Sequence, residues 1–345
     1  MANESHSIWN ENPETYFTVK LVYSAFVTLI YPFAHYCVLA KSPKSFGLLK
    51  WIIYVHCICF TCEWLGNVFF IDVYDFQPSV FVKINGILKN YIHPIQLYQA
   101  YVILEGITET SGLILFTSRV LLIVDLYRPR PSIQRRICEF LIYCVVFAFG
   151  MWAIPMIIWQ LPDQKFAKLN VIKTHEFYPD CIWDSNVIAI TSTDSTEEDV
   201  ICVLIVANCV SIGFAIFISA KIAFYMLSRR MINQSEATKK MHKKFNERTI
   251  LQAILYFTFC CVPFSVLYLT ILLEVHIPGS TYFIDIFSEN HPTACAVSLF
   301  LFYDPYQYYL MELLGIKLRQ KISNASTILV EKVNTISRNS NIVFI

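Results

Sequence analysis

Two carboxylates and one guanidinium lie in a single long apolar stretch of the chain, residues 96–124. Glu105, Glu109, Gly112, Phe116 and Arg119 follow one another at intervals of four, three, four and three residues, which places them on one narrow stripe of a helix. A carboxylate at the centre of a membrane helix costs roughly 2.5–3.5 kcal/mol, so this stripe needs partners or water rather than lipid. The pattern therefore predicts that other helices enclose this one.

The composition of the chain is that of a protein that crosses a membrane several times. Of its 345 residues, 56% are hydrophobic and only 15% are charged. In a soluble domain, about a quarter of the residues are charged. The net charge of +1 indicates no particular partner, and neither a nucleic acid nor a cofactor is expected.

Seven apolar segments are long enough to span a bilayer, which predicts an all-α membrane protein with a seven-transmembrane helix bundle over residues 16–314. Residues 1–15 form a segment before the first span, and residues 315–345 form a tail that begins with a short amphipathic helix. The predicted spans cover residues 16–40, 48–71, 96–124, 137–159, 200–227, 250–273 and 292–314.

Basic residues are concentrated in alternate connections between these spans. With the N-terminus outside, 21 of the 27 Lys and Arg residues fall on the inner side or at adjacent helix ends. The six others are Lys20, Lys83, Lys89, Lys165, Lys168 and Lys173. Because basic residues accumulate in cytoplasmic loops, the distribution predicts the N-terminus outside, the C-terminus inside and membrane lipid around the bundle. Asn3 begins a glycosylation sequon on the predicted outer side.

Two further carboxylates, Glu63 and Asp304, lie in predicted spans. Glu63 shares a helix face with His56, Cys59 and Asn67. By helical rise both carboxylates lie roughly 15–18 Å from the inner ends of their spans, so we expect them to meet near the middle of the bilayer. Such a pair shares a proton, binds a cation or separates, which would couple helix packing to ionisation. A neutral Glu63 that is hydrogen-bonded in the core explains the pattern equally well.

Proline interrupts two of the predicted spans. Pro263 lies in the middle of the sixth and removes a backbone hydrogen bond, and Pro305 does the same in the last span. Asp304 and Tyr308, four residues apart, share one face there. We expect a helix kink at each proline. The predicted polar switch comprises Glu63, Asn67, Asp304 and Tyr308.

Several short motifs in order along the chain carry a resemblance to a known family. The last span contains a DPxxY sequence similar to the NPxxY signature of rhodopsin-like seven-transmembrane G-protein-coupled receptors, and the sixth contains CCVP in place of their CWxP. The chain is more similar to the nematode serpentine chemoreceptors of the Str superfamily, most of all class H (Srh). The motifs that carry this are Lys41-Ser42-Pro43, Phe116-Thr117-Ser118-Arg119, Pro179-Asp180-Cys181 and His291-Pro292.

The resemblance implies roles for residues on the third span. Tyr101 and Glu105 would lie at the height of a ligand pocket, with Glu109 one turn deeper, and Arg119 would contact a heterotrimeric G protein. The family also implies a disulfide to Cys181. This chain has no cysteine at the outer end of the third span, which leaves that disulfide open, and Cys295 is a candidate substitute.

We therefore expect a chemosensory receptor in the cell membrane, in the cilia of chemosensory neurons, that detects a small-molecule odorant and activates a G protein. The alternative is a transporter or cation channel that conducts along Glu63, Glu105, Glu109 and Asp304. The absence of an internal repeat weighs against that alternative. No catalytic motif supports an enzyme.

Overall fold

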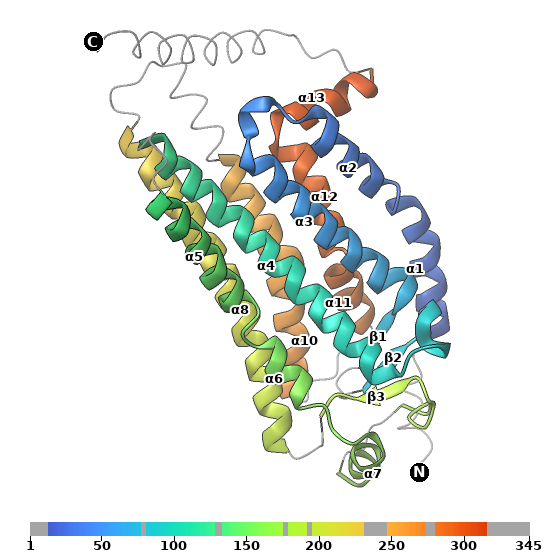
Figure 1. The fold of residues 1–345 in the computed structure, drawn as a ribbon. Helices are drawn as coiled ribbons and strands as arrows, with labels where there is room; N and C mark the ends of the chain where they lie inside the picture. Colours follow the sequence, from blue (N-terminus) through green and yellow to red (C-terminus); the bar gives the residue numbers. More distant parts are fainter. Residues whose placement is uncertain are drawn as a thin grey trace, which may run out of the picture.

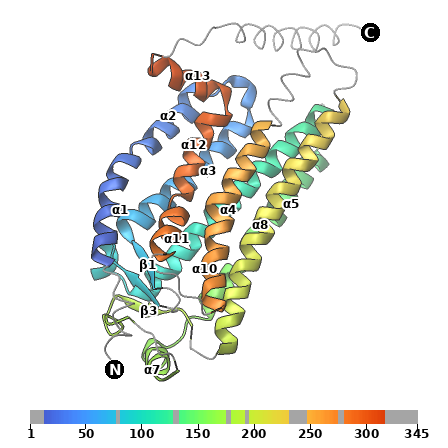
Figure 2. The same ribbon diagram turned by 180° about the vertical axis from the view of Figure 1, so that it is seen from behind.

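Long helices run side by side along the molecule, with a small sheet at one end and a short helix at the other (Figure 1). The computed structural model describes residues 13–76, 81–127, 133–174, 179–191, 195–230, 247–273 and 280–315. We call the two ends of the bundle the sheet end and the α13 end. Figure 2 shows the same bundle from behind, with α10 between α8 and the pair formed by α11 and α12.

The described helices include six stretches that are long and apolar enough to cross a membrane. They are Pro13–Lys41, Leu48–Phe70, Pro94–Val124, Ile133–Trp159, Val200–Met226 and Glu247–Thr270. The shorter apolar helix His291–Phe302 completes a bundle of seven, so the predicted all-α seven-transmembrane fold is confirmed.

Proline marks most of the breaks within these stretches. The first divides into α1 (Pro13–Val27) and α2 (Ile30–Lys41), and the fourth into α5 (Ile133–Gly150) and α6 (Ile154–Trp159). Pro32 and Pro155 lie just after these two breaks. A proline cannot donate a hydrogen bond to the carbonyl four residues earlier, and its ring crowds that carbonyl. The helix is therefore interrupted in the turn before it.

The sixth stretch shows the same effect at Pro263. The segment Phe257–Cys261 is a π-helix, and it leads directly into α10 (Val262–Leu272). A second π-helix, Gly66–Phe70, closes the second stretch after α3 (Leu48–Leu65). The sequence predicts a kink at Pro263, and the structure has a widened turn in the residues just before it.

The end of the bundle differs from the sequence prediction. Helix α11 (Ser280–Glu289) is followed by α12 (His291–Phe302), which ends where Tyr303 adopts an extended conformation with φ −109° and ψ 111°. A new helix, α13 (Asp304–Leu313), begins there with Pro305 in its first turn. Pro305 therefore starts a separate helix instead of kinking a continuous one. A proline suits this position because the first amide groups of a helix have no intrahelical acceptor.

Helix α4 (Pro94–Tyr127) runs through the centre of the bundle. It packs against α3, α5 and α8 (Ser195–Arg230), so most of its surface is covered. The predicted enclosure of the Glu105–Arg119 stripe follows from this position. Glu109 and Arg119 are both at most 5% exposed.

Three short strands at the sheet end were absent from the sequence prediction. Strand β1 (Val73–Phe76) pairs antiparallel with β2 (Phe81–Ile84), and β2 pairs with β3 (Val187–Ala189). Helix α7 (Gln164–Thr174) holds β3 through its first residue, since the Gln164 side chain accepts from Ala189 N at 2.7 Å and donates to Ala189 O at 3.0 Å. The sheet thus joins the connection before α4 to the one before α8.

Candidate functional site

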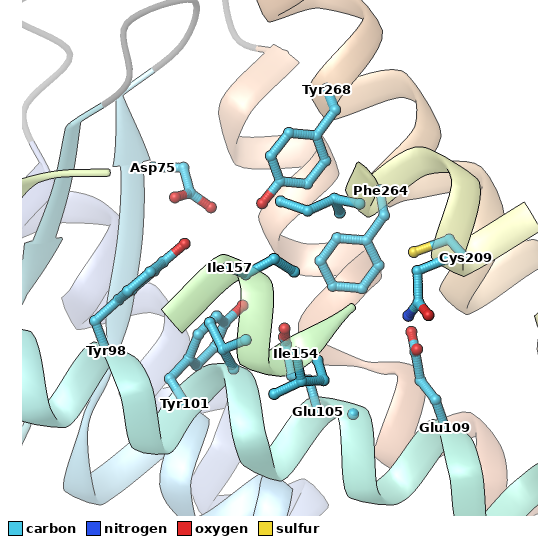
Figure 3. Close-up of a pocket in the computed structure, with 14 residues that line it drawn as sticks. Asp75, Tyr98, Tyr101, Glu105, Glu109, Ile154, Ile157, Cys209, Phe264 and Tyr268 are labelled. Carbon is cyan, nitrogen blue, oxygen red and sulfur yellow. The ribbon is translucent and has the colours of Figure 1, made fainter. Parts of the chain in front are cut away.

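A pocket opens beside α4 towards the sheet end (Figure 3). Side chains from β1, α4, α6, α8 and α10 line it, and the cavity among them measures about 50 Å³. The lining residues that carry polar groups are Asp75, Tyr98, Tyr101, Glu105, Glu109, Asn208, Cys209 and Tyr268. Ile154, Ile157, Ile205 and Phe264 supply apolar walls.

The periodicity of α4 brings its contribution together. Tyr98, Tyr101, Glu105 and Glu109 follow at intervals of three, four and four residues, so they lie on one face. The rings of Tyr98 and Tyr101 stack with centroids 6.1 Å apart. Tyr101, Glu105 and Glu109 are the residues that the sequence predicts for a ligand site, and all three line the pocket.

Asp75 is a pocket residue that sequence reasoning missed. It comes from β1, and its carboxylate points towards the hydroxyl groups of Tyr98 and Tyr268 (Figure 3). Burial raises the pKa of Asp75 to about 7, although the positive charge of Lys20 acts in the opposite direction. The signal that could have found it is a pair of short apolar runs, Val73–Phe76 and Phe81–Ile84, separated by a few residues that include Pro78.

A cation near Asp75 is already engaged elsewhere. Lys20 of α1 lies 2.6 Å from Asp72 and also forms an ion pair with Glu289 of α11. Tyr16 donates to the same Glu289 at 2.8 Å. This cluster ties α1 to α11 and to the segment that enters the sheet.

Arg119 lies in a second polar cluster on α4, nearer the α13 end. Its guanidinium donates to Gln252 at 2.5 Å, to Tyr303 at 2.6 Å and to Thr249 at 3.3 Å. It also lies over the rings of Phe116 and Tyr303, with centroids 5.2 and 5.3 Å away. The cluster joins α4 to the sixth stretch and to the break between α12 and α13.

A neighbouring ion pair strengthens the same junction. Arg248 pairs with Asp304 and donates to Gln307 at 2.9 Å. Gln252 in turn donates to Ser298 of α12 at 3.2 Å. The sixth stretch is therefore attached to both α12 and α13 by hydrogen bonds and charge.

The prediction that Glu63 and Asp304 lie close together is wrong. Glu63 Oε1 lies 3.6 Å from Nδ1 of His291, at the first residue of α12, whereas Asp304 pairs with Arg248 beyond the last residue of that helix. Helix α12 has 12 residues, which separates the two sites by roughly 18 Å along its axis. The break at Tyr303, which the sequence prediction lacked, places Asp304 at the end of the bundle.

The other predicted switch residues are also apart from one another. Asn67 is 1% exposed in the π-helix after α3, and neither atom of its amide has a hydrogen-bond partner among the described residues. Tyr308 is 37% exposed on α13. Of the four predicted members, Glu63 and Asn67 lie in α3 and its continuation, whereas Asp304 and Tyr308 lie in α13.

Several other predictions concern residues away from the pocket. Cys181 and Cys295 are both free thiols, so the substitute disulfide between them is not formed. Cys295 Sγ lies instead 3.4 Å from Nε2 of His291. Asn3, the segment before residue 13 and the tail beyond residue 315 lie outside the described residues. Within the described part of the chain, no group of three or more His, Cys, Asp or Glu side chains is arranged to hold a metal ion.

Comparison with protein families matches residues 11–316 to the serpentine type 7TM GPCR chemoreceptor Srh. The chain belongs to this family. The match covers all the described helices and both polar clusters on α4, and it confirms the resemblance to class H. Comparison with curated proteins gave no match. As an Srh chain with seven apolar helices, the protein is a multi-pass membrane protein of a chemoreceptor class.

Proposed function

We propose that this Srh receptor detects a small molecule at the pocket beside α4 and activates a heterotrimeric G protein at the α13 end. The observation that supports this most directly is the placement of both polar clusters on one helix. Glu105 and Arg119 are 14 residues apart, roughly 21 Å along α4. A ligand that shifts α4 against its neighbours would therefore act on both ends.

The basic residues support an orientation with the sheet end outside the cell. Lys41, Lys50, Arg135, Lys221 and Arg248 all lie in described segments towards the α13 end, and cytoplasmic surfaces are enriched in such residues. The pocket then faces the extracellular side and Arg119 lies near the cytoplasmic side. Cell-surface membranes, including those of sensory cilia, are a suitable location for this arrangement.

The contacts of Arg119 support an inactive packing that a ligand can release. Gln252 and Tyr303 hold the guanidinium, and the Arg248–Asp304 pair holds the sixth stretch against α13. The π-helix before Pro263 lies between this junction and the pocket wall at Phe264. Ligand contact with α10 would favour a second packing in which the sixth stretch moves away from Arg119.

Transport along a line of carboxylates has less support. Asp304 lies one helix length from Glu63 and is paired with Arg248, so it does not continue a path from the pocket. Ion flux through receptor-containing liposomes, lost in Glu109→Gln, would favour the transport hypothesis instead.

The test is nucleotide exchange by purified G protein in the presence of receptor and a broad panel of odorants. We expect some ligands to stimulate exchange, and Arg119→Ala to abolish the stimulation. Arg135→Ala is the matched control, because Arg135 forms an ion pair of 2.9 Å with Glu139 within α5. Absence of stimulation across the panel, or equal loss in both variants, would contradict the proposal.

A further inference from the structure

The pocket is acidic at both of its ends. Asp75 lies at the end nearest the sheet, beside Tyr98, and Glu105 and Glu109 lie deeper. Tyr98 precedes Glu105 by seven residues, roughly 10 Å along α4. The lining that the structure describes contains no Lys, Arg or His to balance these groups.

Lys20, whose charge acts on Asp75, does not line the pocket. Lys20 is already paired with Asp72 and Glu289, both outside the pocket lining. A carboxylate in a poorly solvated site is costly unless a cation pairs with it. A ligand that carries positive charge would bring to Asp75 and Glu105 a cation that the described lining does not contain.

A second observation points to a hydrogen-bond donor in the ligand. Asn208 is 4% exposed and lines the pocket, yet its Oδ1 has no hydrogen-bond partner among the described residues. An ammonium group has three donors and no acceptor, so it can serve this oxygen and a carboxylate together.

The walls between the two acidic ends suit a thin aliphatic chain. Ile154 and Ile157 offer apolar contact, and the stacked rings of Tyr98 and Tyr101 offer faces that attract cations. The cavity of about 50 Å³ has room for only a few water-sized groups. A flexible chain fits such a space better than a ring.

We propose that the pocket recognises a linear aliphatic diamine, with one ammonium at Asp75 and the other at Glu105, Glu109 and Asn208. Glu105 and Glu109 are one turn apart, so both face the same ammonium. Ionisation of Asp75 on binding completes the second ion pair and releases a proton. The inference rests on the proposed receptor function and names the ligand class of its pocket.

The experiment is calorimetry on the purified full-length receptor in nanodiscs with three probes built on the same five-carbon chain. These are 1,5-diaminopentane, 1-aminopentane and pentane-1,5-diol. We expect the diamine to bind about tenfold more tightly than the monoamine, and the diol to show no binding, because each ion pair adds roughly 1.4 kcal/mol. Equal affinities for diamine and monoamine, or diol binding as strong as either, would overturn the proposal.

Two variants assign the ends of the ligand. Asp75→Asn is expected to lower diamine affinity to the monoamine level, and Glu105→Gln to weaken both amines. The control is Asp184→Asn. Asp184 is an acid at the same end of the molecule that lies 3.9 Å from Lys83 and outside the pocket, so its substitution should change neither the diamine nor the monoamine affinity. If Asp75→Asn does not fold, the ranking of the three probes on the unmodified receptor and on Glu105→Gln still tests whether the pocket binds a diamine.

Calorimetry reads binding without a G protein, so the two proposals fail in different ways. Diamine binding with no nucleotide exchange would overturn G-protein coupling and leave the diamine site standing. Exchange stimulated by neutral odorants, together with no binding of either amine, would overturn the diamine site alone.

Discussion

The charged residues at the two ends of α4 have different surroundings. Near the α13 end, Arg119 donates hydrogen bonds to Gln252 of the sixth stretch and to Tyr303, and it lies over the ring of Tyr303. Near the sheet end, Glu105 and Glu109 face a cavity whose described lining carries no basic residue. One helix thus carries a buried cation that the protein itself solvates and acids that line a cavity.

The difference indicates which charges stabilise the fold and which can respond to binding. Hydrogen bonds to a buried charged group contribute roughly 1.5–3 kcal/mol each, so the cluster around Arg119 holds one packing of the helices. An acid that faces a cavity keeps part of its interaction energy for a ligand. The pocket is therefore expected to tolerate charge removal better than the Arg119 cluster does.

The largest expected effect is at the backbone of the sheet end. A Cβ atom on Gly86 would lie 2.2 Å from the carbonyl oxygen of Phe70, a backbone atom that cannot rotate away. We expect Gly86→Ala to cost about 3 kcal/mol, the upper part of the range for overpacking, and to abolish amine binding by displacing the sheet that carries Asp75. Thermal unfolding and calorimetry measure the two effects.

Gly66→Ala is the matched control for that change. The nearest atom to its Cβ is Cδ1 of Leu104 at 2.9 Å, which is the end of a flexible side chain. A smaller loss of stability is expected. Equal melting temperatures for the two variants would show that the sheet end is less rigid than the contacts indicate.

The second largest effect is expected at Gln252, which holds Arg119. Gln252→Leu removes an acceptor 2.5 Å from the guanidinium, at a cost of roughly 1.5–3 kcal/mol. Release of the sixth stretch should also raise G-protein nucleotide exchange in the absence of ligand. Thr249→Val removes a contact of 3.3 Å to Arg119. It should lower stability and raise basal nucleotide exchange, both to a smaller extent than Gln252→Leu. Unchanged basal exchange in Gln252→Leu would argue that Arg119 does not restrain activation.

The pH dependence of amine binding distinguishes the two acidic ends of the pocket. Because the pKa of Asp75 is raised to about 7, its carboxylate is present above that pH and is lost as the pH falls through it. The preference for diamine over monoamine should therefore decline from about tenfold to near one below about pH 6. Calorimetry at several pH values measures the ratio.

Other groups that face Asp75 set the control for this pH profile. They are Lys20 of α1, Asp285 of α11, Tyr98, Tyr101 and Glu105 of α4, and Tyr268 of α10. Asp75→Asn should make the ratio independent of pH. A ratio that still falls in this variant would assign the titration to one of these neighbours.

The smallest expected effect lies between the two clusters, at Gly112. A Cβ there would lie 2.7 Å from Cε2 of Tyr256, whose ring packs edge-on to His291 at 4.8 Å. Gly112→Ala should shift Tyr256 and change ligand-stimulated exchange by about threefold, or roughly 0.7 kcal/mol, with little change in amine affinity.

Gly106→Ala provides the opposite case, because its Cβ would meet Ile154 in the pocket wall at 2.8 Å. It should alter amine affinity and leave basal exchange as it was. If both variants affect the same property, the pocket and the Arg119 cluster do not act as separate regions.

Much of the pocket was predictable because membrane burial constrains charged residues strongly. Glu105 and Glu109 were assigned to one inward face from their spacing, Tyr101 was added by the family resemblance, and all three line the cavity. Asp75 could not be assigned in this way. Its position depends on a sheet in which Val82 pairs with Ile188, more than a hundred residues away along the chain.

The pairing of Glu63 with His291 and of Asp304 with Arg248 could not be predicted from the sequence either. Depth in a helix can be counted from the sequence only when the ends of that helix are known. The break at Tyr303 changed the count for Asp304.

The sequence by itself determined the seven apolar helices, the irregular turn at Pro263 and the inward stripe of α4. These follow from local rules, since helical periodicity, missing amide donors and the cost of charge in lipid act within a few turns. Only the tertiary structure decided which partner each buried charge meets. Such pairings join residues from distant segments, and the acidic pocket and the enclosed arginine acquired their different surroundings from them.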